Sequence, residues 1–283
     1  MNRATIVIPV FNRAHLVHRA IDTALAQTVP CEVILADHGS TDRIAEVAGR
    51  YQGRIRYLRR ERDQGPVACW RDGIAHATTD FVHLTYDDDW LQPTFIERCL
   101  ELMRDDVAFA YTRVTLHFEP SGKTEPSVLH PPGVRPIGPL VQHLLRARYT
   151  VSPGCALFRR RDAMENLLPE VPGATGPYGK GKGVGEDLLL FLLTSLGYEK
   201  YAHVEAPLAD FLAHPGSITI GAMVGGKARA LAAAYETAKR HYLAQTGSLR
   251  RERGARTLAS RARWLLESKA MDQYARKALG RLR

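Results

Sequence analysis

The sequence predicts an α/β fold in which helices cover a mostly parallel central sheet. Two observations support this prediction. Short apolar runs of strand length alternate along residues 1–104 with segments whose apolar residues recur at helical spacing. The run at 5–10 is apolar throughout, as expected of a strand buried on both faces. With 45% hydrophobic residues, the 283-residue chain can also bury a large core.

The first part of the chain is expected to form regular strand–helix units. Strands are predicted at 5–10, 31–36, 55–58 and 81–86, and helices at 14–27, around 44–48, at 65–77 and after Pro93. Gly39 supplies a turn, and Ser40 or Thr41 can cap the helix that follows it. Such an alternation is typical of crossover units in a parallel sheet.

The second part is less regular and indicates a small antiparallel extension of the sheet. We expect a long strand at 107–118, an exposed loop at 124–136, a helix near 137–147, and strands near 154–159 and 200–212. From about Lys227 the sequence is helical and increasingly basic. The predicted organisation is a domain over 1–220, divided near 104/105, followed by a basic helical extension over 221–283.

Composition restricts the class of protein. No apolar run approaches the ~18 residues that a membrane span requires, and no signal-type segment precedes the first strand, so a cytoplasmic protein is expected. The four cysteines lie far apart among apolar neighbours, which favours buried free thiols over disulfides or a zinc site.

The net charge of +9 is concentrated at the C-terminus. Residues 250–283 contain eleven Lys or Arg against three Asp or Glu. The rest of the chain is therefore close to neutral, and no nucleic acid partner is expected. A helix predicted at 257–280 has an apolar stripe that could pack on the core or lie on a membrane surface, and both interpretations remain open.

Three consecutive carboxylates follow a predicted buried strand. Asp87, Asp88 and Asp89 come directly after the apolar run that begins at Phe81. Ligand crevices open at the carboxyl ends of strands in α/β sheets. Because adjacent like charges repel, a divalent cation such as Mg²⁺ or Mn²⁺ carrying a substrate's phosphates would stabilise the cluster. The alternative is a solvated acidic turn.

A glycine-rich stretch precedes another pair of acids. Residues 172–185 contain six glycines among fourteen positions and are expected to form a mobile loop. The stretch is not a P-loop, because no Gly-Lys-Ser/Thr sequence follows a strand. Glu186 and Asp187 come next and begin an apolar helix.

Four stretches in this order resemble the family 2 glycosyltransferases, which have the GT-A fold. They are Val7-Ile-Pro-Val-Phe-Asn12, Asp37-His-Gly-Ser-Thr-Asp42, Asp80 with Asp87-Asp-Asp-Trp-Leu-Gln-Pro93, and Glu186-Asp187. The resemblance covers 4–104 well and about 150–217 more loosely. It implies a nucleotide-binding part over about 1–104, an acceptor part over about 105–220, and an EC 2.4 hexosyltransferase-type activity.

The resemblance implies that the first strand's end and the turn at 37–42 hold the nucleotide. Pro9 and Phe11 would line the base pocket, and Asp37 would border it. His38 stands where the family usually has a second Asp, and an imidazole can accept the same hydrogen bond from a uracil; an exposed turn residue is the alternative. Arg71 could steady the pyrophosphate or Asp87, or could be a surface arginine.

For the acidic cluster, the resemblance assigns Asp89 to Mn²⁺ or Mg²⁺, and Asp87 and Asp88 to the ribose or to waters on the metal. His214, before Pro-Gly-Ser, matches a late family motif in which a histidine reaches back to the metal. A neutral imidazole suits Mn²⁺ better than Mg²⁺. A loop histidine without such a role is the alternative.

Asp187 resembles the family's catalytic base, which takes the proton of the acceptor hydroxyl. At a helix start, its pKa is expected to be lowered by the helix dipole; a helix-starting acid with no chemical role is the alternative. A single base argues for inversion. The glycine loop, with Gly179, Gly181, Gly183 and Gly185, is expected to act as a flexible lid over the donor.

The sequence thus predicts a metal-dependent, inverting glycosyltransferase. Its donor would be a nucleotide-diphosphate sugar, with UDP favoured, and its acceptor a saccharide or a lipid-linked molecule, in bacterial cell-surface polysaccharide or glycoconjugate synthesis. One alternative is a sugar-nucleotide nucleotidyltransferase, although the turn after the first strand lacks the glycine- and basic-rich loop of that class. Another is a non-catalytic module whose residues 250–283 contact a membrane or an anionic polymer.

Overall fold

The computed structural model describes residues 1–127, 130–147 and 151–252. Within them a ten-stranded sheet has the order β3-β2-β1-β4-β9-β6-β10-β5, while β7 pairs with β6 and β8 with β10. The strands are β1 (Ala4–Val10), β2 (Cys31–Asp37), β3 (Arg56–Arg59), β4 (Phe81–Leu84), β5 (Trp90–Leu91), β6 (Val107–Phe118), β7 (Lys123–Pro126), β8 (Gly133–Pro136), β9 (Ala156–Arg159) and β10 (Lys200–Ala213).

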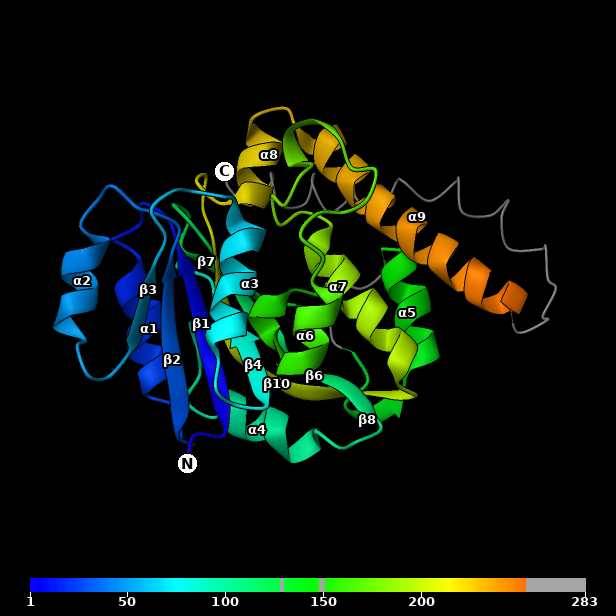
Figure 1. Cartoon of the computed structure of the whole chain (residues 1–283), viewed down its shortest axis with the longest axis horizontal. Coiled ribbons are helices and arrows are strands. Elements are labelled where there is room, and N and C mark those ends of the chain that lie inside the picture. The colour runs from blue at the N-terminus through cyan, green and yellow to red at the C-terminus, as the bar shows by residue number, and fades with distance from the viewer. Residues whose placement is uncertain (128–129, 148–150, 253–283) are drawn as a thin grey trace.

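Helices cover both faces of this sheet (Figure 1). They are α1 (Val17–Leu25), α2 (Ile44–Arg50), α3 (Pro66–His76), α4 (Phe95–Leu102), α5 (Ile137–Leu145), α6 (Arg160–Asn166), α7 (Glu186–Thr194), α8 (Ile218–Val224) and α9 (Ala228–Glu252). Helix α6 contacts α3 on one side and α7 on the other, so the three form one layer, and α9 packs on α7. Helices α1 and α4 lie together on the opposite face.

The order of the first four strands creates a crevice. Strand β1 pairs in parallel with β2 on one side and with β4 on the other. The chain moves outward from β1 through β2 to β3 and then returns to β4, so the direction of winding reverses between β1 and β4. In open α/β sheets, ligands bind outside the carboxyl ends of the strands at such a point. All seven residues of β1 are buried, which confirms the two-sided burial predicted from its apolar sequence.

The expected fold class is confirmed: β1, β2, β3 and β4 are parallel, while β9 is antiparallel to both β4 and β6. The predicted exposed loop at 124–136 is wrong in part, because it contains β8 and most of β7. These short polar segments become strands because the edges of β10 and β6 supply backbone partners.

The predicted cap of α2 is also wrong. The helix begins at Ile44, and its first residue donates a backbone hydrogen bond to Asp42 Oδ1 at 3.2 Å. Ser40 instead accepts a hydrogen bond from the backbone N–H of Asn12 at 2.9 Å. The hydroxyl therefore joins the turns that follow β1 and β2.

The helical character predicted from Lys227 is confirmed as far as Glu252 by α9. The boundary proposed at residue 220 falls within α8, and Ala238 and Tyr242 of α9 belong to the main hydrophobic core. The predicted helix at 257–280 lies outside the described residues. Among the described helices, none is both long and apolar enough to span a membrane.

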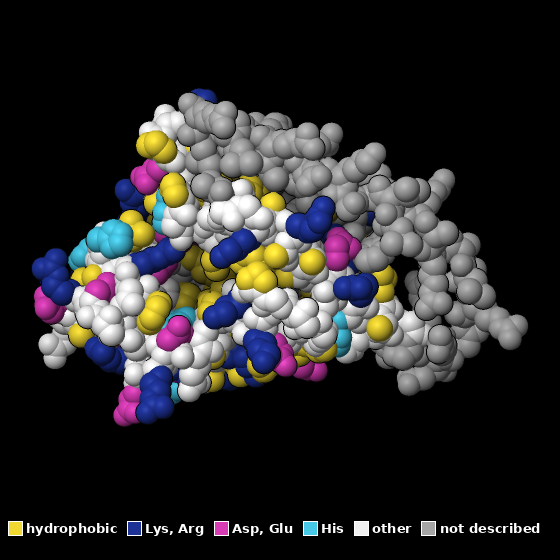
Figure 2. All heavy atoms as spheres, turned by 90° about the horizontal axis from the view of Figure 1, so that it is seen from above, with side chains coloured by type: hydrophobic (Ala, Val, Ile, Leu, Met, Phe, Trp, Pro, Cys, Tyr) yellow, Lys and Arg dark blue, Asp and Glu magenta, His cyan; other side chains and the backbone are white. Residues whose placement is uncertain are grey.

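The described surface mixes the two signs of charge on the face seen in Figure 2, where Lys and Arg side chains are interspersed with Asp and Glu. Most of the predicted basic cluster at 250–283 falls outside the described region.

Candidate active site

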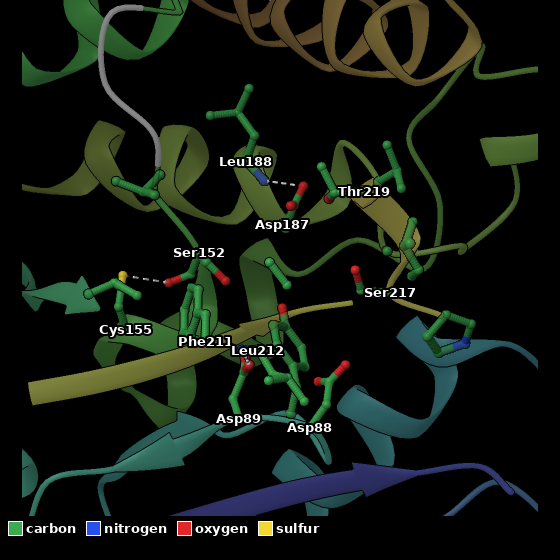
Figure 3. A pocket seen from close by; sticks show the side chains of 18 of the residues that line it. Asp88, Asp89, Ser152, Cys155, Asp187, Leu188, Phe211, Leu212, Ser217 and Thr219 are labelled. Carbon is green, nitrogen blue, oxygen red and sulfur yellow. Dashed lines mark hydrogen bonds between the residues drawn. The ribbon is translucent and has the colours of Figure 1, made fainter. Parts of the chain in front are cut away.

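A cavity of about 560 Å³ opens at the carboxyl ends of β1 and β4. Predicted site residues from four separate segments line it: Pro9 and Phe11 at the end of β1, His38 after β2, Asp87, Asp88 and Asp89 after β4, and Gly183 and Asp187 at the start of α7. Figure 3 shows Asp187 on one side of this cavity and Asp88 and Asp89 on the other. The fold thus brings together residues that are up to 178 positions apart in the chain, as Pro9 and Asp187 are.

Arg13 neutralises part of the acidic cluster. Its Nη1 lies 3.1 Å from Oδ1 of Asp87 and 2.7 Å from Oδ2 of Asp88. Its Nη2 donates to the carbonyl of Gly216 at 2.8 Å, which ties the segment after β10 to the turn after β1. Arg13 was not predicted from the sequence as a site residue. The available signal was its position directly after the first family-like stretch.

Burial raises the pKa of two carboxylates of the acidic cluster, Asp87 and Asp89. It raises the pKa of Asp87 to about 7, with Arg13 opposing the shift and Asp88 adding to it. Burial, followed by the charge of Asp88, raises the pKa of Asp89 well above its usual range. Asp89 Oδ1 accepts a hydrogen bond from the backbone of Leu212 at 3.0 Å, as Figure 3 shows. A buried carboxylate in this state is stabilised by a cation.

His214 contacts the acidic cluster through Asp88. Its Nε2 lies 3.0 Å from Oδ2 of Asp88, and its Nδ1 accepts a hydrogen bond from the backbone of Gly216 at 3.3 Å. An accepting Nδ1 places the proton of the neutral ring on Nε2, which then donates to Asp88. The structure therefore brings His214 to the cluster through Asp88, and its role as a metal ligand stays a prediction.

Asp37 and His38 are adjacent in sequence, but only His38 is among the described residues that line the cavity. The side chain of Asp37 is buried, its Oδ1 accepts from the backbone of Gly39 and Ser40, and its Oδ2 accepts from Tyr57 at 2.6 Å. Asp37 thereby shapes the turn and is not among the described residues that line the cavity.

His38 lines the cavity opposite Phe11, with their ring centroids 6.0 Å apart. Its Nδ1 lies 3.3 Å from Asp63. Burial lowers the pKa of His38, and Asp63 opposes the shift. A neutral imidazole at this position can accept one hydrogen bond and donate another.

Arg71 is not brought to the cavity. Its guanidinium group donates to the carbonyls of Met164 and Leu167 at the end of α6. The preceding residue of α3, Trp70, lines the cavity instead and packs against Tyr86, with ring centroids 5.5 Å apart. Successive helical residues point about 100° apart, so one residue faces the site and the next faces α6.

The second half of the glycine-rich stretch is closely packed. A Cβ atom on Gly183 would lie 2.6 Å from Cη2 of Trp70, and one on Gly181 would lie 2.7 Å from the carbonyl oxygen of Pro169. Gly181, Gly183 and Gly185 all have positive φ, which favours glycine, and Gly179 is buried. The glycines let the backbone approach Trp70 at the cavity wall, and their action as a lid stays a prediction.

Asp187 is held by three donors. Its Oδ1 accepts from the backbone of Gly185 at 2.9 Å and of Leu188 at 2.7 Å, and its Oδ2 accepts from Tyr235 at 2.9 Å. The expectation of a lowered pKa is wrong: burial raises the pKa of Asp187 to about 6, although these hydrogen bonds oppose the shift. The loss of hydration outweighs the helix start. A carboxylate of raised pKa is a stronger base while remaining ionised at neutral pH.

The residues of the acidic cluster fit a cation whose remaining ligands come from a bound substrate. Among the described residues, no group of three or more His, Cys, Asp or Glu side chains is arranged to hold a metal ion. Asp88 and Asp89, adjacent in sequence, both line the cavity and offer carboxylate oxygens. Mg²⁺ typically takes one or two carboxylates and completes its shell with phosphate oxygens and water. The chemistry of this donor set suits that kind of site.

The family described as "Glycosyl transferase family 2" matches residues 5–168, which is more than half of the chain. The chain belongs to this family. The match contains the turn after β2 and the acidic cluster, and it ends before Asp187 and His214. The assignments of these two residues therefore rest on their geometry and on the resemblance.

Curated glycosyltransferases share part of the chain. The succinoglycan biosynthesis protein ExoU of Rhizobium meliloti is 31% identical over 37% of this chain and 33% of its own length. The hyaluronan synthase of Pasteurella multocida is 32% identical over 38% of this chain and 12% of its own. Glycosyltransferase YibD of Escherichia coli is 26% identical over 61% and 53%. The chain spans about half or less of the length of these relatives.

Solved structures confirm the fold over nearly the whole chain. TarS 1-349 of S. aureus in complex with UDP aligns with 99% of this chain and 88% of its own, with a TM-score of 0.61 and 14% identity. The complex of the same protein with UDP-GlcNAc aligns with 99% and 89%, also with a TM-score of 0.61. The family 2 glycosyltransferase has the expected GT-A architecture.

Proposed function

We propose that the protein transfers a sugar from a nucleotide-diphosphate donor, with a UDP-sugar favoured, to a hydroxyl group of an acceptor. The observation that carries this proposal is the convergence of Asp88, Asp89 and Asp187 on one cavity at the reversal point between β1 and β4. The acidic cluster lies within residues 5–168, which match the family, whereas Asp187, the proposed base, lies beyond them. Their meeting supports donor binding and proton removal at one site.

The proposed donor and the proposed role in polysaccharide synthesis are supported by proteins to which the chain is similar. TarS was solved with UDP and with UDP-GlcNAc, so these are the nucleotides to test first. ExoU is a succinoglycan biosynthesis protein, which supports a role in bacterial cell-surface polysaccharide or glycoconjugate synthesis. In this chain, Pro9, Phe11 and His38 would border the base, with His38 taking the position of the usual second Asp.

The chemical role of Asp187 is that of a general base. The backbone donors Gly185 and Leu188 hold Oδ1, and Tyr235 holds Oδ2, so the carboxylate is oriented before the acceptor binds. Oδ2 retains a lone pair that can accept the proton of the attacking hydroxyl. A single base acting on the acceptor favours one displacement with inversion of the anomeric carbon, which NMR of the product would reveal.

Asp89, with Asp88 beside it, would hold Mn²⁺ or Mg²⁺ together with the donor. When bound, the cation would stabilise negative charge on the leaving diphosphate. Arg13 keeps Asp87 and Asp88 in place. His214, through its contact with Asp88, fixes the cluster from the segment after β10.

The test compares wild type with Asp187→Asn in donor binding and in transfer. Thermal shift with UDP, GDP, dTDP and CMP, each with and without Mn²⁺, identifies the nucleotide and the metal requirement. We expect UDP with Mn²⁺ to stabilise both proteins, and transfer from UDP-sugars to fall at least about 10²-fold in the variant, as loss of a general base does. Full transfer by Asp187→Asn would contradict the assignment, and release of pyrophosphate instead of UDP would indicate a nucleotidyltransferase.

A further inference from the structure

Lys and Arg side chains line the same cavity. Among the described residues they are Arg13, Arg113 and Lys239. Arg13 is paired with two carboxylates of the acidic cluster, as described above. Lys239 on α9 lies 2.8 Å from Oε1 of Glu236, one turn earlier. These two cations therefore have counterions within the protein.

Arg113 differs from both, because no carboxylate of the described chain lies within 4.0 Å of it. Its Nη2 donates to the carbonyl of Ser127 at 3.0 Å. Its Nε is buried and has no hydrogen-bond partner among the described residues. A guanidinium group stays protonated in proteins, and a charge removed from water is costly unless it is paired. The cavity wall thus carries a positive charge that has no counterion among the described residues.

Two histidines lie beside this arginine, His203 on β10 and His130 in the segment before β8. Tyr111 of β6 pairs with His203 of β10, and Arg113 follows Tyr111 by two residues, on the same face of the strand. His130 contacts both rings: its Nδ1 lies 2.5 Å from the hydroxyl of Tyr111, and its centroid lies 5.4 Å from that of His203. The four side chains all line the cavity.

His203 is the most deeply buried of these groups, with 1% of its surface exposed. Neither of its ring nitrogens has a hydrogen-bond partner of normal geometry within the described chain. Leaving such atoms unpaired costs free energy, because the nitrogens lose their hydrogen bonds to water. Buried polar atoms at a cavity wall are satisfied when a ligand or water occupies the cavity.

The electrostatic environment of this region is positive. Burial lowers the pKa of His203 and of His130 to about 4; the charge of Arg113 contributes to both shifts, and the backbone of Pro131 and of His130 opposes the shift of His203. Both rings are therefore neutral at pH 7 and can each donate one hydrogen bond. A negatively charged group would meet a guanidinium fork and imidazole donors here, and the fork geometry suits phosphate and carboxylate.

We propose that Arg113 and His203, with His130 beside them, form a subsite for an anionic oxygen group, phosphate or carboxylate, carried by the acceptor. This inference rests on the proposed sugar transfer and specifies the class of acceptor. Arg113 lies on β6, in the part of the chain beyond the nucleotide-binding strands β1, β2 and β4. The cavity joins it to Asp187, so an acceptor can place its anionic group at Arg113 and its hydroxyl at the base.

The experiment titrates full-length protein, labelled at the histidine rings, with inorganic phosphate and with glucuronate, and follows the imidazole signals by NMR. The signal of His203 is assigned with His203→Asn. We expect saturable shifts in wild type, and affinity weakened about tenfold or more in Arg113→Gln, because a charge-assisted hydrogen bond is lost. Arg54→Gln, which changes an exposed arginine outside the cavity, should bind as wild type does.

The same titration in saturating UDP distinguishes the acceptor subsite from the diphosphate site. Phosphate that still binds supports the proposal, whereas phosphate displaced by UDP, absence of a saturable shift, or undiminished binding by Arg113→Gln would overturn it. If circular dichroism shows Arg113→Gln to be unfolded, Arg113→Lys, which keeps the charge but loses the fork, should weaken binding by a smaller factor. Failure of wild type to bind any of UDP, GDP, dTDP and CMP would refute the proposed function, while the sensitivity to Arg113 still tests the anion site.

Discussion

The hydroxyl group of Tyr235 lies 2.9 Å from Oδ2 of Asp187, although the two residues are 48 positions apart. Tyr235 belongs to α9, which packs against α7 and contributes Leu231, Tyr235 and Lys239 to the cavity wall. Part of the segment predicted as a basic helical extension over 221–283 thus lines the cavity. Its hydrogen bond acts on the oxygen atom of the proposed base that remains open to the acceptor.

Tyr235→Phe should shift the pH dependence of transfer. Asp187 must be ionised to act as a base, so kcat of wild type should fall as pH drops through about 6. The Tyr235 hydroxyl lowers the pKa of Asp187, so its loss raises that pKa and moves the acidic limb to higher pH. We expect activity several-fold below wild type near pH 6 and a smaller difference near pH 8.5, measured as kcat across this range.

Tyr51→Phe provides a matched control, because the Tyr51 hydroxyl also donates to a carboxylate, that of Asp22, at 2.9 Å outside the cavity. Its pH profile should match that of wild type. A Tyr235→Phe profile with an unmoved acidic limb would show that the hydroxyl does not tune the base.

Glu186→Gln should stabilise the protein at alkaline pH. Glu186 is fully buried, its Oε2 has no partner among the described residues, and burial raises its pKa from 4.5 to about 7. The folded state therefore binds the proton more tightly than the unfolded state, and the free energy of unfolding falls as pH rises from about 4.5 to 7. Glutamine avoids this cost and can still accept the hydrogen bond from Gly181.

Urea denaturation at several pH values measures this effect. The variant should be more stable than wild type by up to about 3 kcal/mol at pH 8, from 1.36 kcal/mol per pKa unit. The difference should nearly vanish at pH 4.5. A variant less stable than wild type at pH 8 would show that the ionised carboxylate is compensated in the native state.

Gly183→Ala and Gly173→Ala should destabilise the protein by different amounts, because both strain the backbone but only Gly183→Ala also creates a clash with Trp70. Both glycines have φ near +80°, but a Cβ on Gly183 meets Trp70 at 2.6 Å, whereas a Cβ on Gly173 meets nothing within 4 Å. Gly173→Ala should cost about 1 kcal/mol of unfolding free energy for the left-handed backbone. Gly183→Ala should cost roughly 1–3 kcal/mol more, because the site is overpacked.

Thermal or urea unfolding of the two variants measures the difference, and the fluorescence of Trp70 reports on the contact. Equal destabilisation of the two would indicate that the loop yields around Gly183 without loss of packing. That outcome would favour the mobile lid predicted from the glycine-rich sequence.

The contrast between Arg13 and Arg71 shows how far the sequence could predict the site. Arg13 comes directly after a family-like stretch, whereas Arg71 lies within α3 and was proposed to steady the pyrophosphate or Asp87, or to be a surface arginine. The structure gives that contact to Arg13, at 3.1 Å, because the turn after β1 faces the turn after β4. Arg71 faces α6 instead. Its neighbour Trp70 lines the cavity. The helical pattern of the sequence does not specify which of these two adjacent residues faces the cavity, since that depends on the neighbouring elements.

The sequence alone determined the strand–helix alternation, the parallel arrangement around β1, and the position of the acids after β4, because these depend on periodicities and turns within short segments. The tertiary structure decided which groups meet: Tyr235 with Asp187, His214 with Asp88, and Arg113 with two histidines of other segments. It also decided that burial, rather than the helix start, sets the pKa of Asp187. Side-chain partners and desolvation arise from packing between segments far apart in the chain, which no local pattern records.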